Sequence, residues 1–411
     1  MAKFDENAKP FGNKWLDERL GVNTLMRVLN TEYWIPKNIN FLWAMGMVLA
    51  ATFGILVVSG IFLMMYYKPD TSLAFDSVNY TIMTEVGYGW LWRHIHGVGA
   101  SLVFLIIYIH MFTGIYYSSY KKGRELIWLS GMGLFVAFSA EAFSGYMLPW
   151  GQMSYWAGMV ITELFAGGSL EATGLVEWIR GDYVPGDAYL TRFFMLHVLL
   201  IPLVIIGLIV LHFGTLRLPH VNNQDGEDFD YAEAAKLYKE GKVKESKVIP
   251  FSPVFLSKDV FVMGVYFILF FYLVFYHFNF AMDPVNFDPA NGLSTPAHIY
   301  PEWYFLWSYE ILRPFNKDFG LIAFGIAQAA LFFLPFIDRS PNVAPAHKRG
   351  LFQIWFWVLI IIMIALTALG KLPPTDPLYA TLGFIFAVAF LLMGPILFVI
   401  TKFEKPLKKG A

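Results

Sequence analysis

Residues 93–110 have the sequence Arg-His-Ile-His-Gly-Val-Gly-Ala-Ser-Leu-Val-Phe-Leu-Ile-Ile-Tyr-Ile-His, and no further charged residue follows until Lys121. Two of these histidines, His96 and His110, stand at positions i and i+14. A helix turns by about 100° and rises about 1.5 Å per residue, so their imidazoles lie within about 40° of one face and about 21 Å apart. The hydrocarbon core of a bilayer is roughly 30 Å thick. The stretch therefore predicts a membrane-spanning helix with one histidine toward each surface.

A second stretch repeats this arrangement, with His197 and His212 at i and i+15 between Arg192 and Arg217. This spacing gives an offset of about 60°, again close to one face. A single histidine in a membrane helix is most often a packing residue with a hydrogen-bond partner. Two matched pairs on separate helices instead favour two haem irons, one above the other, each held by two histidines.

The composition defines the class of protein. The chain has 411 residues, of which 57% are hydrophobic and 15% are charged. Soluble domains are about 25% charged, so we expect an integral membrane protein in a lipid bilayer, with no nucleic-acid partner. The chain has no cysteine, which excludes disulfides, thiolate-bound iron–sulfur clusters and thioether-attached haem. Any haem must therefore be bound non-covalently.

Eight apolar segments are each long enough to cross a bilayer as a helix. They are residues 41–67, 94–120, 126–148, 193–215, 260–282, 319–337, 350–370 and 377–401. We predict an all-α integral membrane protein with eight transmembrane helices. Its expected parts are a cytoplasmic amino-terminal segment with an interfacial helix at 14–30 (1–40), a four-helix dihaem b domain (41–215), a cytoplasmic connector with a short amphipathic helix (216–258) and a carboxyl-terminal four-helix domain (259–411).

The distribution of positive charge predicts the orientation, because Lys and Arg are concentrated in cytoplasmic loops. The amino end, the carboxyl tail and the three loops on the same side carry 23 of the 30 Lys and Arg residues. Both termini are therefore predicted to be cytoplasmic, and the two histidine-bearing helices run in the same direction. His96 is then level with His197 near the outer surface, and His110 with His212 near the cytoplasm.

Four glycines recur at the spacing of the histidines. Gly46 and Gly60 stand at i and i+14 in the first apolar segment, and Gly131 and Gly145 have the same spacing in the third. Small residues let neighbouring helices approach closely. Two pairs at this spacing favour clearance for a flat group at each histidine level over ordinary helix packing.

Two further motifs complete a family pattern: Gly145-Tyr-Met-Leu-Pro-Trp-Gly-Gln-Met-Ser154, and Pro301-Glu302-Trp303-Tyr304 in a predicted outer loop. With the paired histidines and glycines, they make nearly the whole chain resemble cytochrome b of the respiratory quinol–cytochrome c oxidoreductases. The resemblance implies two non-covalent haem b groups, a quinol-oxidising site at the outer face and a quinone-reducing site at the inner face. It makes the carboxyl-terminal part the quinol domain.

The resemblance also suggests roles for individual residues. The outer quinol site would comprise five residues: Phe143, Tyr146, Glu302, Tyr304 and Tyr309. Glu302 would accept a quinol proton, as suits a carboxylate on an outer loop beside aromatic side chains. Arg93 and Arg192 lie just outside the histidine-bearing segments and suit haem propionates. The inner quinone site would include Lys258 and Asp259.

The chain departs from respiratory relatives near the inner site. Arg217 stands five residues after the deep ligand, where these relatives have a histidine. Thr113 stands where many relatives have an arginine for a haem propionate. Three nearby basic residues could replace that arginine: Lys121, Lys122 and Arg124. These changes leave the quinone open between ubiquinone and a naphthoquinone.

The implied function is that of the catalytic membrane subunit of a quinol–cytochrome c reductase. Quinol would be oxidised at the outer site, with one electron passing to a Rieske iron–sulfur protein and the other inward through two haems, coupled to proton translocation. The expected partners are the Rieske protein, a membrane cytochrome c subunit and a second copy of the complex. The expected location is a bacterial cell inner membrane.

Two alternatives remain open from the sequence. A dihaem b membrane anchor of another quinone-linked dehydrogenase would explain the histidines, but not the Pro301–Tyr304 loop. A non-enzymatic transporter with intramembrane histidines would show no haem spectrum.

Glu141 places a carboxyl group inside the third apolar segment, four residues before Gly145. A carboxyl group at membrane depth generally faces the bundle interior. We expect Glu141 to lie near the outer haem, where it takes part in proton exit or stabilises local water. The alternative is an ion pair with a basic group on a neighbouring chain.

Overall fold

The computed structural model describes residues 19, 33–166, 173–217 and 219–407. Apart from Arg19, the predicted interfacial helix at 14–30 lies outside these residues. Seven helices of the described part are long and apolar enough to cross a membrane, which confirms an all-helical membrane protein. They are η2–α3 (Phe41–Ala44, Met45–Met64), α5 (Gly89–Tyr116), α6 (Glu125–Met147), α9–η6–α10 (Asp187–Met195, Leu196–Leu200, Ile201–Arg217), η7–α12 (Phe251–Phe255, Leu256–Tyr276), α16 (Gly350–Gly370) and α17 (Pro377–Lys402).

The remaining predicted span, residues 319–337, forms two shorter helices, α14 (Lys317–Phe332) and α15 (Leu334–Ile337). With 16 residues, α14 is about 24 Å long, shorter than the roughly 30 Å hydrocarbon core. Pro335 lies at the start of α15. Because proline has no N–H to donate, it is tolerated in a first helical turn but not in a helix interior. The predicted segment therefore exists as a helix that breaks near its end.

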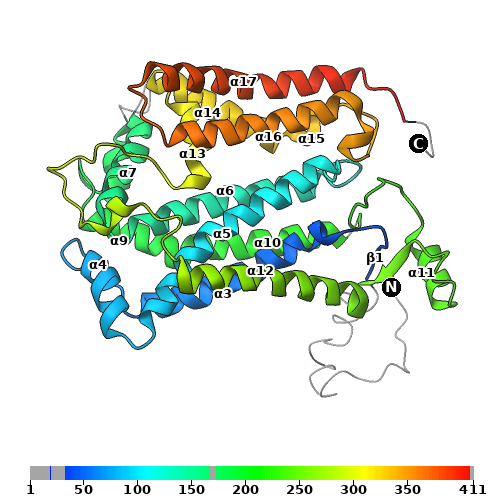
Figure 1. The fold of residues 1–411 in the computed structure, drawn as a ribbon, viewed down its shortest axis with the longest axis horizontal. Helices are drawn as coiled ribbons and strands as arrows, with labels where there is room; N and C mark the ends of the chain where they lie inside the picture. The colour runs from blue at the N-terminus through cyan, green and yellow to red at the C-terminus, as the bar shows by residue number, and fades with distance from the viewer. Residues whose placement is uncertain (1–18, 20–32, 167–172, 218, 408–411) are drawn as a thin grey trace.

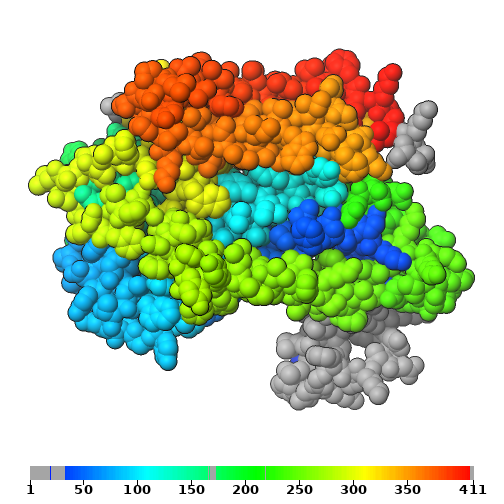
Figure 2. All heavy atoms as spheres, viewed as in Figure 1, coloured from blue at the N-terminus to red at the C-terminus, as the bar shows by residue number. Residues whose placement is uncertain are grey.

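The helices form two layers (Figure 1). In one layer α3 packs on α5 and α6 packs on α10, while α12 lies against α3 and α5. The other layer contains α14, α16, α17 and α13 (Leu306–Leu312). Helix α16 touches α5 and α14 touches α6, which joins the layers. Figure 2 shows α16 and α17 covering one long edge of the molecule.

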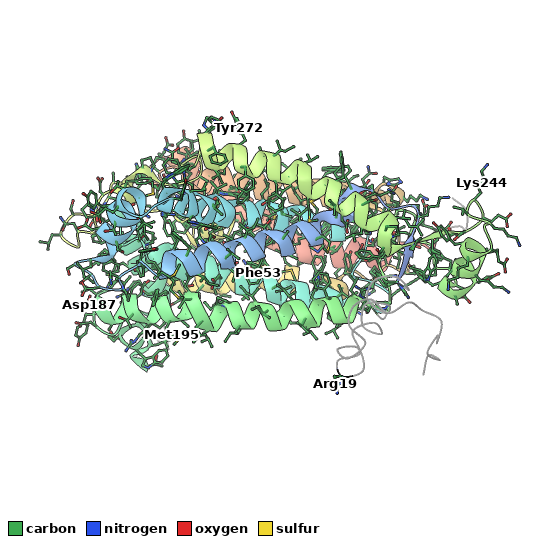
Figure 3. The ribbon with its side chains drawn as sticks, turned by 90° about the horizontal axis from the view of Figure 1, so that it is seen from below. Arg19, Phe53, Asp187, Met195, Lys244 and Tyr272 are labelled. Carbon is green, nitrogen blue, oxygen red and sulfur yellow. The ribbon has the colours of Figure 1, made fainter. Side chains whose placement is uncertain are left out.

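The two ends of the bundle differ in structure. One end holds the short segments α4 (Ala74–Asp76), η3 (Ser77–Glu85), α7 (Gln152–Glu163), η4 (Leu164–Ala166), α8 (Leu175–Arg180) and η8 (Pro284–Phe287). The short helix η9 (Trp303–Phe305) lies deeper and packs against the middle of α5. At the other end lie α11 (Tyr231–Lys239), η10 (Ala346–Lys348) and the end of α17 (Figure 1). Figure 3 shows Asp187 and Lys244 at these opposite ends, with Phe53 between them. Charge patterning predicts that the Lys244 end is cytoplasmic.

A two-stranded sheet joins the connector to the amino-terminal part of the chain. Strands β1 (Trp34–Pro36) and β2 (Val248–Pro250) pair antiparallel, with Ile35 opposite Ile249. The backbone N–H of Phe251 extends the pairing by donating to the carbonyl of Tyr33, with N···O 2.8 Å. Sequence analysis predicted no strand, because three residues are too short for alternation to be recognised.

A buried charge network joins the two layers at the Lys244 end. Arg349 donates to both carboxyl oxygens of Asp338 at 2.9 and 3.0 Å, and to Glu404 at 2.9 and 3.1 Å. Lys121 lies 3.0 Å from Asp338, and the hydroxyl of Tyr120 donates to it at 2.6 Å. The side chains of Arg349 and Asp338 are both 0% exposed. The network therefore connects the α5–α6 loop with three segments of the carboxyl-terminal layer.

Replacing Arg349 with Met should strongly destabilise the protein, because Asp338 would keep its charge but lose its bidentate partner. Breaking a buried ion pair from one side typically costs about 3–5 kcal/mol. The measurement is the midpoint of thermal unfolding of the purified complex. Lys122→Met is the matched control, because it breaks a pair with Asp228 whose side chains are 51% and 67% exposed, and such pairs contribute little. Equal midpoints for both variants would contradict the prediction.

Candidate functional site

The four predicted ligand histidines form two facing pairs. The ring centroids of His96 and His197 are 6.0 Å apart, and those of His110 and His212 are 6.4 Å apart. A metal–imidazole bond of about 2.0–2.1 Å on each side leaves the centroids of two rings that share one ion roughly 6 Å apart. Both pairs therefore have the separation that a shared metal ion requires. Each pair joins one residue of α5 to one residue of the α9–α10 helix.

Hydrogen bonds define which ring nitrogen is free. Ser59 Oγ donates to the carbonyl of Ile55 at 2.8 Å, so it accepts from His96 Nδ1 at 3.0 Å. Ser130 Oγ likewise donates to the carbonyl of Ile127 at 2.9 Å and accepts from His212 Nδ1 at 3.0 Å. With the proton on Nδ1, the Nε2 lone pair is available to a metal. A partner on the second nitrogen is the usual way of orienting a metal-binding histidine.

His197 uses a backbone carbonyl for the same purpose. Its Nδ1 donates to the carbonyl of Glu141 at 3.0 Å, and Ser144 Oγ donates to the same carbonyl at 2.9 Å. His94 differs from the four ligands, because it faces α12. Its Nδ1 donates to the carbonyl of Val274 and its ring stacks on Phe278 at 3.7 Å.

Each of the four predicted glycines faces one of the four histidines. A methyl group built on Gly46, Gly60 or Gly131 would lie 3.7, 3.2 or 3.1 Å from the Cε1 atom of His110, His96 or His212. A methyl group on Gly145 would overlap Cε1 of His197 and lie 2.9 Å from its Nδ1. The glycines of α3 thus leave room for the histidines of α5, and those of α6 for the histidines of the α9–η6–α10 helix.

A cavity of about 280 Å³ adjoins the His96–His197 pair. Its lining includes Glu302, Tyr146, Tyr304 and Arg93. The histidine pair and the Pro301–Tyr304 loop therefore share one space.

Burial raises the pKa of Glu302 to about 8, and the carboxylate of Asp283 adds to this shift. A hydrogen bond from the hydroxyl of Tyr146 and the nearby charge of Arg93 act in the opposite direction. A carboxyl group with a pKa near neutrality can both take up and release a proton at physiological pH.

Two residues predicted for the outer quinol site and one predicted for a haem propionate lie outside the cavity lining. Phe143 packs edge-to-face on Phe193. The hydroxyl of Tyr309 donates to the carbonyl of Ile299 at 3.2 Å. Arg192 is exposed and donates to the carbonyls of Trp178 and Ile179. Their predicted roles therefore receive no support from the cavity.

The opposite end of α10 carries an aromatic stack. The guanidinium of Arg217 lies 3.9 Å from the ring centroid of Tyr33, whose other neighbour is the ring of His220 at 5.5 Å. His220 stacks in turn on Tyr231 at 3.9 Å. Arg217 Nη1 and His220 Nδ1 are buried without a hydrogen-bond partner among the described residues. Arg217 therefore has donor capacity to offer a ligand.

Asp259, predicted for the inner site, is 1% exposed, and neither of its carboxyl oxygens has a hydrogen-bond partner in the described part of the chain. Its neighbour Lys258 is exposed. A buried carboxyl group without partners is costly unless a ligand or water completes its hydrogen bonds. Asp259 therefore marks a candidate binding position.

Models of two families match the chain. Residues 30–219 match cytochrome b/b6/petB, and residues 289–391 match cytochrome b (C-terminal)/b6/petD. The chain is 41% identical over 405 residues to cytochrome b of Rickettsia bellii, covering 96% of this chain and 94% of that protein. It is 39% identical to cytochrome b of Allochromatium vinosum over 393 residues, covering 93% and 94%. The chain belongs to the cytochrome b family.

A solved structure of a hyperthermophilic respiratory Complex III contains a similar chain. It superimposes with a TM-score of 0.86 at 40% sequence identity, covering 95% of this cytochrome b and 98% of that chain. This cytochrome b is accordingly a subunit of quinol–cytochrome c reductase, or respiratory complex III. The finding sets aside the dehydrogenase anchor and the transporter considered from the sequence.

The cytochrome b family implies haem b, and the residues present fit such a group. The separations of the paired rings and the glycines opposite each histidine suit a flat macrocycle. The three basic residues considered as replacements at Thr113 have other partners. Lys121 binds Asp338, Lys122 binds Asp228, and Arg124 donates to the carbonyls of Pro219 and His220.

Sequence analysis missed the hydrogen-bond partners of the histidines in this cytochrome b. A usable signal was present, because Ser59, Ser130 and Ser144 immediately precede three of the four glycines. Ser59 and Ser130 each accept from the histidine that the next glycine accommodates, and Ser144 donates to the carbonyl that accepts from His197.

Gly145→Ala should displace His197 and remove the outer haem, because the added methyl group overlaps the imidazole. The measurement is haem content per cytochrome b, from the reduced-minus-oxidised spectrum of purified complex. Gly133→Ala on the same helix is the matched control, since its methyl group would lie 3.7 Å from Leu208 in ordinary contact. Retention of both haems in the Gly145 variant would contradict the role assigned to this glycine.

Proposed function

We propose that this cytochrome b oxidises quinol in the cavity beside the Pro301–Tyr304 loop and reduces quinone at the opposite end of α10. The observation that supports the proposal most strongly is the shared space of the His96–His197 pair and Glu302. A substrate bound there is close to a proton acceptor and to an electron acceptor at once. Both are needed, because quinol oxidation releases protons together with electrons.

Glu302 is the proposed proton acceptor. Only its ionised form can accept, and with a pKa of about 8 this form increases steeply between pH 6 and pH 8. Tyr146 orients the carboxyl group through its hydrogen bond, and Arg93 stabilises the ionised form. Tyr304, stacked on Phe104 at 4.0 Å, forms a rigid aromatic wall of the cavity.

His96 and His197 are the proposed ligands of the outer haem b, and His110 and His212 of the inner one. When bound, the two haems would supply one-electron carriers at two depths, each held by two histidines of this chain. Arg93 lines the outer cavity, where its charge suits a haem propionate. The four glycines leave clearance for both macrocycles.

The inner quinone site is proposed to use Arg217 and Asp259, with Lys258 nearby. The unpartnered Nη1 of Arg217 can donate to a quinone carbonyl, and the carboxyl group of Asp259 can deliver a proton. The quinone is ubiquinone or a naphthoquinone. Mass analysis of quinone extracted from the purified complex distinguishes the two.

We further propose the usual setting of such a subunit. One electron per quinol passes to a Rieske iron–sulfur protein and onward to a membrane cytochrome c subunit, and the complex is a homodimer. The reaction translocates protons across a bacterial inner membrane, with both termini of this chain in the cytoplasm. The charge distribution supports this orientation.

Replacing the ligands individually tests the haem assignment. His96→Ala or His197→Ala should remove the outer haem alone, and His110→Ala or His212→Ala the inner haem alone. The measurement is the reduced-minus-oxidised spectrum with haem extraction. His94→Phe is the matched control, because His94 lies two residues from a ligand yet faces α12. A His110 variant with two full haem equivalents would refute the assignment.

Glu302→Gln should slow quinol oxidation by about a hundredfold, since positioned general bases contribute roughly 10²–10⁴-fold. In the unmodified complex the rate should rise with pH up to about 8, following ionisation of Glu302, and the Gln variant should lose this rise. The measurement is steady-state cytochrome c reduction across this pH range, with haem content checked in parallel. An unchanged pH profile in the variant would exclude Glu302 as the proton acceptor.

A further inference from the structure

Glu141 makes a second contact with an outer ligand, through its side chain. It lies on α6, one helical turn before Gly145, and lines the outer cavity. Its Oε1 atom is 3.1 Å from Nδ1 of His197, while its backbone carbonyl accepts from the same nitrogen at 3.0 Å. The Nδ1 proton of His197 therefore goes to the carbonyl, and the carboxyl oxygen of the same residue lies in contact beside it. Oε2 is buried and has no hydrogen-bond partner within the described residues.

The histidines differ in the chemical group of the side chain that lies at Nδ1. His96 and His212 donate to the hydroxyl groups of Ser59 and Ser130, which are neutral. His197 alone among these three has a carboxyl group at its Nδ1. The outer pair thus carries an acidic partner that His212 of the inner pair lacks.

This difference has a direct effect on ligand strength. Oxygen atoms that carry negative charge beside Nδ1 increase the basicity of Nε2. A carbonyl together with a carboxyl oxygen therefore does so more than one hydroxyl group. A more strongly donating ligand favours the more highly charged, oxidised iron. The outer site should therefore hold an electron less tightly than it would with a serine partner.

We propose that Glu141 is a positioning residue that lowers the reduction potential of the outer haem relative to the inner one. The proposal rests on the ligand assignment under the proposed function. It gives Glu141 a role through His197 rather than through the substrate proton. It also explains why a carboxyl group is placed within a membrane helix, where polar groups need a specific partner.

The test is a redox titration of the purified complex, followed optically, with the EPR spectrum of the oxidised haems. Glu141→Gln retains the shape of the side chain with a less negative oxygen beside Nδ1, and Glu141→Leu removes the side-chain oxygen while the backbone acceptor remains. The ratio of reduced to oxidised outer haem at a fixed potential should rise severalfold in the Gln variant. In the Leu variant it should rise by about tenfold, equal to about 59 mV for a one-electron couple.

Ser130→Ala is the matched control at the inner site, and it should shift the inner potential alone. The EPR signal of the outer haem should change only in the Glu141 variants. Unchanged outer potentials at full haem content would overturn the proposal. Loss of the outer haem from the Gln variant would also overturn it, in favour of a purely structural role. The ligand assignment is tested separately by the haem spectrum of His197→Ala. If that variant kept both haems, the ligand assignment itself would fail, whatever the Glu141 variants showed.

Discussion

An imidazole that is to bind a metal through Nε2 must give its Nδ1 proton to an acceptor, and His96, His197 and His212 each do so. The fold meets this requirement with two tightly packed helix pairs, α3 with α5 and α6 with α10. Within each pair, one helix supplies the histidines and the other supplies the facing glycines and the acceptors. The proposed metal-binding positions then lie between the two pairs. The orientation of each imidazole is thus determined within one helix pair. The distance between two facing imidazoles is determined by how the two helix pairs pack together.

The sequence predicted best those features that depend on helix periodicity within one segment. The spacings of His96 with His110 and of Gly131 with Gly145 follow from helix geometry alone, so the spans and facing glycines could be expected before any tertiary contact was known. Seven of the eight predicted spans are confirmed by helices long enough to cross a membrane in the described part of the chain. The break after α14 and the β1–β2 pairing were missed because they depend on one proline and on segments far apart in the sequence.

The Lys244 end shows why a residue cannot be interpreted from its position in a helix alone. Arg217 was compared with the histidine that relatives have there, but its surroundings come from elsewhere in the chain. Tyr33, just before β1, stacks between Arg217 and His220 because the β1–β2 sheet holds it there. Arg217 therefore packs against the ring of Tyr33, a contact that the sequence of its own helix does not reveal. Likewise, Phe143 and Tyr309 lie on the expected segments but pack away from the outer cavity.

Buried carboxyl groups in this chain separate into two kinds by their partners. Burial alone would raise the pKa of Asp338, yet Arg349 and Lys121 beside it hold the pKa below its ordinary value. Such a group is complete within the fold and contributes to stability. Glu302 has a partner too weak to offset its burial, and Asp259 has none among the described residues. An incomplete group of this kind is costly to the folded chain unless a substrate, water or ion completes it. Buried carboxyl groups with strong basic partners, such as Asp338, therefore mark the part of this protein that stabilises the fold. Those without such partners, Glu302 and Asp259, mark the parts proposed to bind and react.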